Sequence, residues 1–461
     1  MVQVSIIGAG SVAFSASLVR DLSVTRSLSG STVVLMDIDK ERLNMVRDLA
    51  LRYGKATNTG LRLKTTTSRK KALEGADFVI CSVKVGGYEG MEKERKIAER
   101  YGYLGGLGDR VSDYYGGIGA YYQLRFFLDL AQDMEDMCPD AWLIMAANPV
   151  FEGTTLVARE TKTKVIGVCH GHLEYRHLVE ALKLRPEDIS VQVVGFNHCV
   201  WLTRFLHKQR DAYPLIDEWI ENRAERYWRS KEYLKAETPW ETEQLSPAAV
   251  DMYKMYGLFP VGDTVRSVSP WWYHVSLGTK KRWFGPGGGY DSRIGWSVHL
   301  RLREKAWRRM QALAEDSLAS PTEEFPPTMS GEQHVPFIDA IVNNKETSLQ
   351  LNVPNGGAIP GIPKDVAVEI PVVVNGRGIR AGHVDKLPRR LMLNAMIPRM
   401  LRMEQALQAF QERDRRGLLL ALMGDHRARS LEKSKAMLEE VLAQPWNYQA
   451  SKHYSWSGPK H

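Results

Sequence analysis

The sequence predicts an α/β fold, with a parallel-sheet domain at the N-terminus and an α+β domain after it. Three observations carry this prediction. Short β-rich apolar runs alternate with amphipathic stretches up to residue 195, helical segments dominate from residue 196, and a Pro- and Gly-rich strand-like stretch covers 349–382. Since 461 residues exceed one core of the usual size, we expect two domains, 1–195 and 196–461.

The strands expected in the first domain are nearly continuous apolar runs, as in a sheet covered on both faces. Between them, residues 40–53 place Leu43, Val46 and Leu49 on one helical face, and 117–136 and 173–184 look similar. The predicted strands are Gln3–Ile7, Val33–Asp37, Phe78–Val83, Trp142–Ala147, Lys164–Val168 and Val191–Val194.

The second domain is expected to be mainly helical around the strand-like stretch at 349–382. Residues 447–461 are polar and aromatic without periodicity and predict a loose tail, with docking against the body as the alternative. The predicted helices are 213–235, 247–256, 296–314, 391–411 and 427–442.

Composition and charge exclude several classes of protein. A hydrophobic content of 44% and a charged content of 25% are those of an ordinary globular chain. The 62 Lys and Arg against 54 Asp and Glu give a net charge of +8, which suits an anionic ligand but is too dilute for a nucleic-acid surface. Neither a membrane span nor a signal peptide is evident. Four cysteines make no disulfide framework, so we expect a cytoplasmic protein.

A glycine-rich turn follows the first predicted strand. Its sequence, Gly8-Ala9-Gly10-Ser11-Val12-Ala13, fits G-x-G-x-x-G/A: Gly8 makes the turn, Gly10 lets the backbone approach a pyrophosphate, and the helix opening at Ser11 and Val12 supplies amide donors. Asp37, 27 residues beyond Gly10, ends the second predicted strand, where a carboxylate binds a ribose hydroxyl and repels a 2′-phosphate. This context predicts a Rossmann-type domain that binds NAD.

Polar residues also follow the later predicted strands, where ligands of open α/β sheets bind. Asn148 could bind the nicotinamide ribose or a substrate hydroxyl, or only form an Asx turn. Cys169 and His198, 29 residues apart, could give a thiolate and an imidazole to a catalytic metal that keeps positions open for substrate oxygens. Ordinary packing of these two residues is equally compatible with the sequence.

Together these residues resemble the NAD- and divalent-metal-dependent glycosidases of glycoside hydrolase family 4, whose overall fold is like that of lactate and malate dehydrogenases. The Cys169-His170-Gly171 form, with the stretches 246–253 and 262–266, is similar to the α-glucuronidase branch. The resemblance covers nearly the whole chain and lies in Gly8–Ala13, Asp37, Asn148-Pro149, Cys169-His170-Gly171, Gly195-Phe196-Asn197-His198, Gly262-Asp263-Thr264 and Asn355–Pro371.

The resemblance implies hydrolysis of an α-glycoside of a uronic acid without the usual pair of carboxylates. In the family scheme NAD takes a hydride from C3 of the sugar, a divalent metal polarises the ketone, and a base removes the C2 proton. The glycosidic oxygen then leaves by elimination, water adds, and the hydride returns. Mn²⁺ is the implied metal, and the ligand types would also accept Co²⁺, Ni²⁺ or Fe²⁺.

The roles implied by the resemblance fall on a few residues of this chain. Cys169 and His198 match the metal ligands, and Asp263 is the C2 base, with Tyr253 and Tyr256 in reserve; a helix-cap or turn aspartate is the alternative for Asp263. His170 is the candidate for protonating the leaving group or positioning the metal, with His172 as the second candidate.

A uronate substrate requires a cation for its C6 carboxylate, best supplied by arginine. Arg266 is the first candidate and Arg110, in the glycine-rich loop at 105–110, the second; an ordinary ion pair is the alternative for each. Asn148 and Asn197 are expected to contact the sugar. We expect a small uronic-acid glycoside as partner, no nucleic acid and no membrane, and a homodimer or homotetramer.

Three alternatives stay open. The first is an α-galacturonidase or another α-glycosidase of the same family. The second is an NAD-dependent 2-hydroxyacid dehydrogenase, which shares the glycine turn and the Asn-Pro but has no use for a thiolate metal pair. The third is an NAD-sensing regulator that binds nucleic acid, for which no helix-turn-helix or zinc finger is evident.

Overall fold

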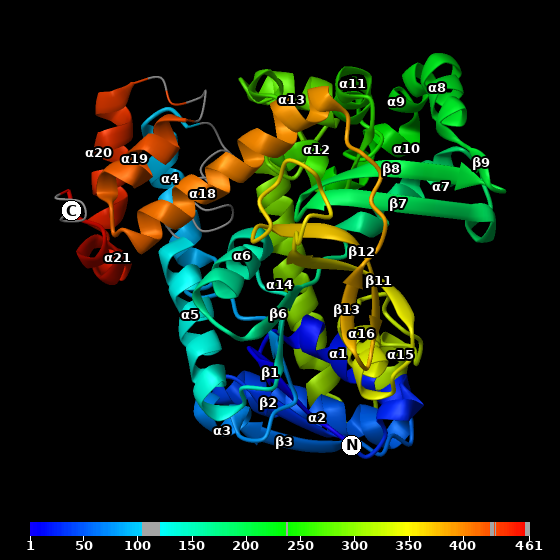
Figure 1. Ribbon diagram of the computed structural model, residues 1–461, viewed down its shortest axis with the longest axis vertical. Helices are drawn as coiled ribbons and strands as arrows, with labels where there is room; N and C mark the ends of the chain where they lie inside the picture. Colours follow the sequence, from blue (N-terminus) through cyan, green and yellow to red (C-terminus); the bar gives the residue numbers. More distant parts are fainter. Residues whose placement is uncertain (104–119, 237, 425–427, 429, 457–461) are drawn as a thin grey trace.

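The structure is a computed structural model that describes residues 1–103, 120–236, 238–424, 428 and 430–456. A mixed sheet runs through these residues, and its N-terminal strands are parallel in the order β3-β2-β1-β4-β5-β6 (Figure 1). This is the Rossmann strand order, so the predicted fold class is confirmed. The parallel strands are β1 (Gln3–Ile7), β2 (Thr32–Met36), β3 (Arg62–Thr66), β4 (Phe78–Cys81), β5 (Trp142–Met145) and β6 (Lys164–Gly167).

The helices were expected mainly from apolar periodicity, and most of them lie where it predicts. The predicted segment 213–235 is divided into three short helices. The described helices of the first half are α1 (Val12–Val24), α2 (Lys40–Ala56), α3 (Arg69–Leu73), α4 (Glu89–Arg100), α5 (Ala120–Met137), α6 (Val150–Glu160) and α7 (Arg176–Ala181). Those of the second half are α8 (Tyr213–Asn222), α9 (Ala224–Trp228), α10 (Lys231–Leu234), α11 (Pro247–Tyr256), α12 (Thr264–Ser267), α13 (Leu277–Phe284), α14 (Arg293–Glu315), α15 (Pro321–Glu324), α16 (His334–Val342), α17 (Arg389–Leu391), α18 (Ile397–Gln411), α19 (Arg415–Met423), α20 (Leu431–Leu442) and α21 (Tyr448–His453).

Side chains of the parallel strands alternate between two apolar cores. Val4 and Ile6 of β1 share one core with residues of α1 and α2, whereas Ile7 shares the other with residues of α3 and α5. Helices therefore cover both faces of the sheet, which explains why its central strands are continuous apolar runs.

The second half of the sheet is antiparallel. β11 (Thr347–Pro354) and β12 (Ala367–Asn375) pair with each other and lie between β6 and β7 (Ile189–Phe196). Beyond β7 follow β8 (Cys199–His207) and β10 (Phe259–Val261), with β9 (Arg210–Asp211) and β13 (Gly378–Ala381) at the margins. The predicted domain boundary after residue 195 falls within β7, and the division into two domains stays a prediction.

Three details of the sequence prediction are wrong. The strand at 191–194 does not belong to the parallel set, because β7 turns directly into β8 and pairs with it antiparallel. The edge strand β3 was missed because its sequence, RLKTT, has no buried apolar run. The tail is not loose through 456: α21 packs the His453 ring 4.7 Å from that of Tyr121, and Trp456 donates to Glu439 at 2.8 Å.

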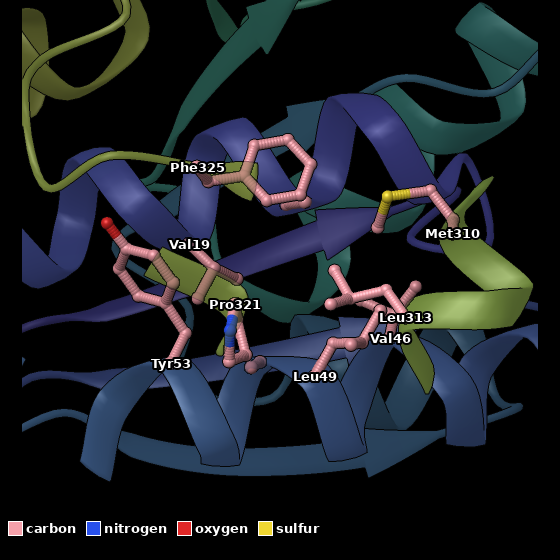
Figure 2. A pocket seen from close by; sticks show the side chains of 10 residues that line it. Val19, Val46, Leu49, Tyr53, Met310, Leu313, Pro321 and Phe325 are labelled. Carbon is pink, nitrogen blue, oxygen red and sulfur yellow. The ribbon is translucent and has the colours of Figure 1, made fainter. Parts of the chain in front are cut away.

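Helices of the C-terminal half pack on α1 and α2 through an apolar contact, here called the seam. Met310, Leu313, Pro321 and Phe325 face α1 and α2 there (Figure 2). The seam leaves a cavity of about 20 Å³. A space of that size and lining holds no sugar. It is a packing seam rather than a substrate site.

A row of four residues crosses the sheet where the parallel and antiparallel halves meet. Gly195 of β7 is opposite Glu369 of β12, Glu369 is opposite Asn352 of β11, and Asn352 is opposite Gly167 of β6. Both glycines are required by space. A Cβ on Gly195 would lie 2.0 Å from the Cys199 carbonyl oxygen, and one on Gly167 would lie 2.4 Å from Val150 Cγ1.

Gly195→Ala should therefore destabilise the fold by about 2 kcal/mol or more, because the clash is with backbone that cannot rotate away. Urea unfolding followed by circular dichroism measures the change in free energy of unfolding. Gly278→Ala, in the first turn of α13 where an added Cβ meets nothing closer than 3.7 Å, is the control and should be neutral or slightly stabilising. Equal stability of the two variants would contradict the assigned register of β7 and β8.

Candidate active site

The predicted site residues of the first half lie at the carboxyl edge of the parallel strands. Gly8 and Gly10 follow β1, Asp37 follows β2, Asn148 follows β5 and Cys169 follows β6. Because parallel strands end at the same edge, residues scattered over 160 positions meet there.

The glycine turn and Asp37 are built as one unit. Gly8 has a φ of +93°, and its amide donates to the Met36 carbonyl at 2.9 Å. The Gly10 amide donates to Asp37 Oδ2 at 2.7 Å, and a Cβ on Gly10 would lie 2.7 Å from the same oxygen. Glycine is thus required at Gly8 by its left-handed backbone and by the Val83 backbone, which a Cβ would approach to 2.9 Å, and at Gly10 for the chain to pass this closely beside the carboxylate.

The start of α1 fits an anion. Ser11 makes no capping hydrogen bond with its side chain, and the first turn of α1 carries no acid. The N-terminal amides of a 13-residue helix thus face outward with the positive end of its dipole. The amide of Val12 is predicted to donate to the cofactor; its side chain lies outside the described ones.

Asn148 stands just before α6, at the carboxyl end of β5. α6 is fixed to α18 by a buried ion pair in which Arg399 donates to Glu152 Oε1 at 2.8 Å. The position of Asn148 is therefore set from both halves of the chain. Its predicted contact with cofactor or sugar stays a prediction.

Asn197 and His198 form the two-residue turn of the β7–β8 hairpin, since Phe196 pairs with Cys199. His198 has a φ of +59°, in the left-handed region, as the second central residue of a type II turn does. Its side chain is buried, and Nε2 lies 3.2 Å from Asp263 Oδ2. The hairpin turn thus delivers an imidazole to the carboxylate.

Asp263 is held in place by its neighbours on both sides. The Thr264 hydroxyl accepts from the Val200 amide at 2.7 Å and donates to the Val200 carbonyl at 3.0 Å, which ties the segment to β8. The Gly262 amide donates to Gln244 Oε1 at 2.6 Å, and a Cβ on Gly262 would lie 2.5 Å from the Gly171 carbonyl oxygen. The Gly262-Asp263-Thr264 segment therefore packs directly on the Cys169-His170-Gly171 segment.

Arg266 lies between two protein carboxylates. Its Nη2 lies 2.7 Å from Asp263 Oδ1, its Nη1 lies 3.2 Å from Glu243 Oε2, and its guanidinium stacks 4.2 Å from the ring centroid of Tyr290. This arrangement holds Asp263 in a fixed orientation. The predicted contact of Arg266 with a uronate stays a prediction, and a uronate there would compete with these two acids.

Burial and charge shift the pKa values of the central groups in different directions. Burial lowers the pKa of His198, so its imidazole is neutral and able to act as a ligand at neutral pH. Burial raises the pKa of Asp263, but the positive charges near it, first that of Arg266, outweigh burial and leave the pKa below its usual range. Burial, and then the Glu369 and Asp263 charges, raise the pKa of the Cys169 thiol. The Asp263 charge thus favours the protonated form of both Cys169 and His198.

The Cys169 thiol and the His198 imidazole are suited to bind a divalent cation. A thiol whose pKa is raised by two nearby carboxylates would lose its proton once a cation balanced those charges. Across the described residues, no group of three or more His, Cys, Asp or Glu side chains forms a metal cage. Two ligands, Cys169 and His198, would leave positions open for substrate oxygens.

His170 and His172 differ in exposure and in protonation. His170 is 69% exposed, and its Nδ1 lies 3.3 Å from Glu332 Oε1, a contact that raises its pKa to about 9. His172 is buried between the Cys169 carbonyl and Gln333, and burial lowers its pKa to about 4. His170 is therefore protonated at neutral pH, whereas the second candidate, His172, is neutral, enclosed and unsuited to donate a proton to a leaving group.

Three acids at or beside this site were not assigned from the sequence: Glu243, which is the second partner of Arg266, Glu332 and Glu369. Glu332, in the loop before α16, partners His170; nothing periodic marks it. Glu369 of β12 lies in a segment that carries the family resemblance, but its buried position next to Asn197 could not be seen before the strand pairing was known. The candidates at 105–110, including Arg110, lie outside the described residues.

Comparisons with known proteins agree with this geometry. Two family models match the chain, "Family 4 glycosyl hydrolase" at residues 3–184 and "Family 4 glycosyl hydrolase C-terminal domain" at 193–428. An α-galacturonidase of Thermoanaerobacterium saccharolyticum is 27% identical over 97% of this chain and 96% of its own. An α-galactosidase of Bacillus subtilis is 27% identical over 85% of each. A 6-phospho-α-glucosidase from gut microorganisms, solved with NAD and Mn²⁺, is similar with a TM-score of 0.73 and 19% identity, over 96% of this chain and 97% of its own.

The His170–Glu332 pair predicts a measurable titration. His170 should titrate near pH 9 in the intact protein. In Glu332→Gln the pKa of His170 should fall toward 6.5, because the contact with the Glu332 carboxylate, the main cause of the raised pKa, is lost. Since folding raises the pKa of His170, protonation of this imidazole stabilises the folded protein. This stabilisation is fully present below pH 6.5 and is lost as the pH rises through 9. NMR of the imidazole protons measures both values, and a His170 pKa near 6.5 in the unaltered protein would contradict the pairing.

Proposed function

The chain belongs to family 4 of the glycosyl hydrolases, and from that premise we propose that it hydrolyses α-glycosides of hexuronic acids. One observation carries the proposal: a single aspartate, Asp263, faces the His198 imidazole, is held by Arg266 and packs beside the Cys169 segment. A carboxylate held beside the two candidate metal ligands would suit removal of a C2 proton, which a bound cation would make more acidic.

The α-galacturonide is the first candidate substrate. The two curated relatives named above act, by their names, on galacto-configured sugars, and the α-galacturonidase matches the chain nearly end to end. The α-glucuronide, favoured by the Cys-His-Gly sequence, is the second candidate and differs only in the configuration at C4. An unmodified galactoside is the third.

The proposed cofactors are NAD and Mn²⁺. The turn at Gly8 and Gly10, with the uncapped start of α1, suits a pyrophosphate, and Asp37 suits a ribose hydroxyl. Cys169 and His198 would hold the metal. When bound, NAD would accept and return a hydride at C3 of the sugar, and the metal would stabilise negative charge on the sugar oxygens.

The protein's own groups then have distinct tasks. Asp263 takes the C2 proton, and Arg266 keeps its carboxylate ionised and aligned, since a guanidinium cannot give up its charge. His170, held protonated by Glu332, gives a proton to the departing glycosidic oxygen. With Arg266 engaged by two acids, Arg110 is the remaining candidate for the C6 carboxylate.

The purified protein with NAD⁺, Mn²⁺ and a thiol reductant should cleave p-nitrophenyl α-D-galacturonide, with the α-glucuronide and α-galactoside assayed in parallel. EDTA should abolish release of p-nitrophenol, and no net NADH should accumulate at 340 nm. Accumulation of NADH with a 2-hydroxyacid would instead favour the dehydrogenase alternative, and cleavage that survives removal of both cofactors would refute the proposal.

The Asp263→Asn variant, with a matched control, tests whether Asp263 acts as the base or only supports the fold. It should lower kcat by roughly 10²–10⁴-fold, the usual contribution of a general base. Asp251→Asn, in α11 where the carboxylate accepts from Tyr273, is the matched control and should keep the activity.

A further inference from the structure

Glu369 is a buried carboxylate that the proposed mechanism does not use. Its side chain is 1% exposed, and its Oε2 accepts from Asn197 Nδ2 at 3.2 Å and from Asn352 Nδ2 at 3.3 Å. Its other oxygen, Oε1, has no hydrogen-bond donor among the described residues. A buried acid bonded only to neutral amides is costly to keep, so its presence calls for a reason.

The position of Glu369 connects it to both proposed metal ligands. It stands in the row that runs from Gly195 to Gly167, and Asn197 and Cys169 each come two residues after those glycines. The Asn197 side chain also lies close enough to the Cys169 thiol to lower its pKa by hydrogen bonding. The contacts therefore form a chain from Glu369 through Asn197 to Cys169, and Asn197 is adjacent to His198 in the hairpin turn.

We propose that Glu369 is a positioning residue of the site: by fixing the amide of Asn197 it sets the orientation of Cys169 and of the hairpin turn that carries His198, and its charge favours a divalent cation between them. Carboxylates that orient metal ligands from behind raise affinity by alignment and by charge. The burial that raises the pKa of Glu369 to about 7 agrees with a group that becomes fully ionised only beside a cation. This inference rests on the proposed metal dependence of the site.

Glu369→Gln is the sharpest variant, since it keeps the shape and one acceptor but removes the charge. It should raise the Kd for Mn²⁺ by about 10–100-fold, measured by EPR of free Mn²⁺ over the metal-free, reduced protein. With saturating Co²⁺ instead, the thiolate-to-metal absorption band should be shifted or weakened, because an uncharged acceptor holds Asn197, and through it Cys169, less firmly. A merely structural role would lower the yield of folded protein but leave this band unchanged.

Glu94→Gln is the matched control. Glu94 is equally enclosed and also accepts from an amide, Asn447 Nδ2 at 2.7 Å, but it lies on α4 with the docked tail. The Kd of the Glu94→Gln variant for Mn²⁺ should stay within twofold of the Kd of the unaltered protein. If Glu369→Gln does not fold, Glu369→Asp carries the test: it keeps the charge, withdraws the acceptor from Asn197, and should disturb the Co²⁺ band.

The outcomes separate this inference from the proposed function. Mn²⁺ binding by Glu369→Gln within twofold of the unaltered protein, or equal weakening by Glu94→Gln, overturns the inference while the proposed function stands. Failure of the unaltered protein to bind Mn²⁺ at all overturns the proposed function first.

Discussion

The site depends on one insertion in the sheet: the β11–β12 pair lies between β6 and β7 and joins the parallel half to the antiparallel half. Each junction is a single registered pair, Asn352 with Gly167 and Glu369 with Gly195. Both glycines admit no side chain, because a Cβ would strike the Cys199 backbone at Gly195 and Val150 of α6 at Gly167. The two inserted strands separate β6 from β7, and so they set how far Cys169 lies from the hairpin turn of His198.

The electrostatics of the site follow from the same junction. The Glu369 charge acts on Cys169, and Asp263 lies beside His198, so acids gather where burial already disfavours charge. Arg266 and the protonated His170 oppose these acids. The thiol pKa is raised and the imidazole stays neutral, which leaves a pair of ligands that a divalent cation would complete.

The sequence predicts the parts of this site that follow local rules and misses those that depend on strand pairing. The glycine turn, Asp37 and Cys169 each stand at the end of a buried strand and could be placed by pattern. Asn197 and His198 were recognised, but not as a hairpin turn, because the apolar run of β7 looks the same in parallel and antiparallel sheets. The partners Glu243 and Glu332 lie in irregular segments, so no periodicity points to them as partners of Arg266 and His170.

The central claim is that Asp263 removes a proton from C2 of the sugar during hydrolysis. It is tested most directly by hydrolysing the preferred p-nitrophenyl glycoside in D₂O and examining the released sugar by NMR and mass spectrometry. The account predicts one solvent-derived deuterium at C2, since a proton taken by the carboxylate exchanges with solvent before C2 is protonated again. Product that keeps its original hydrogen at C2 would contradict it.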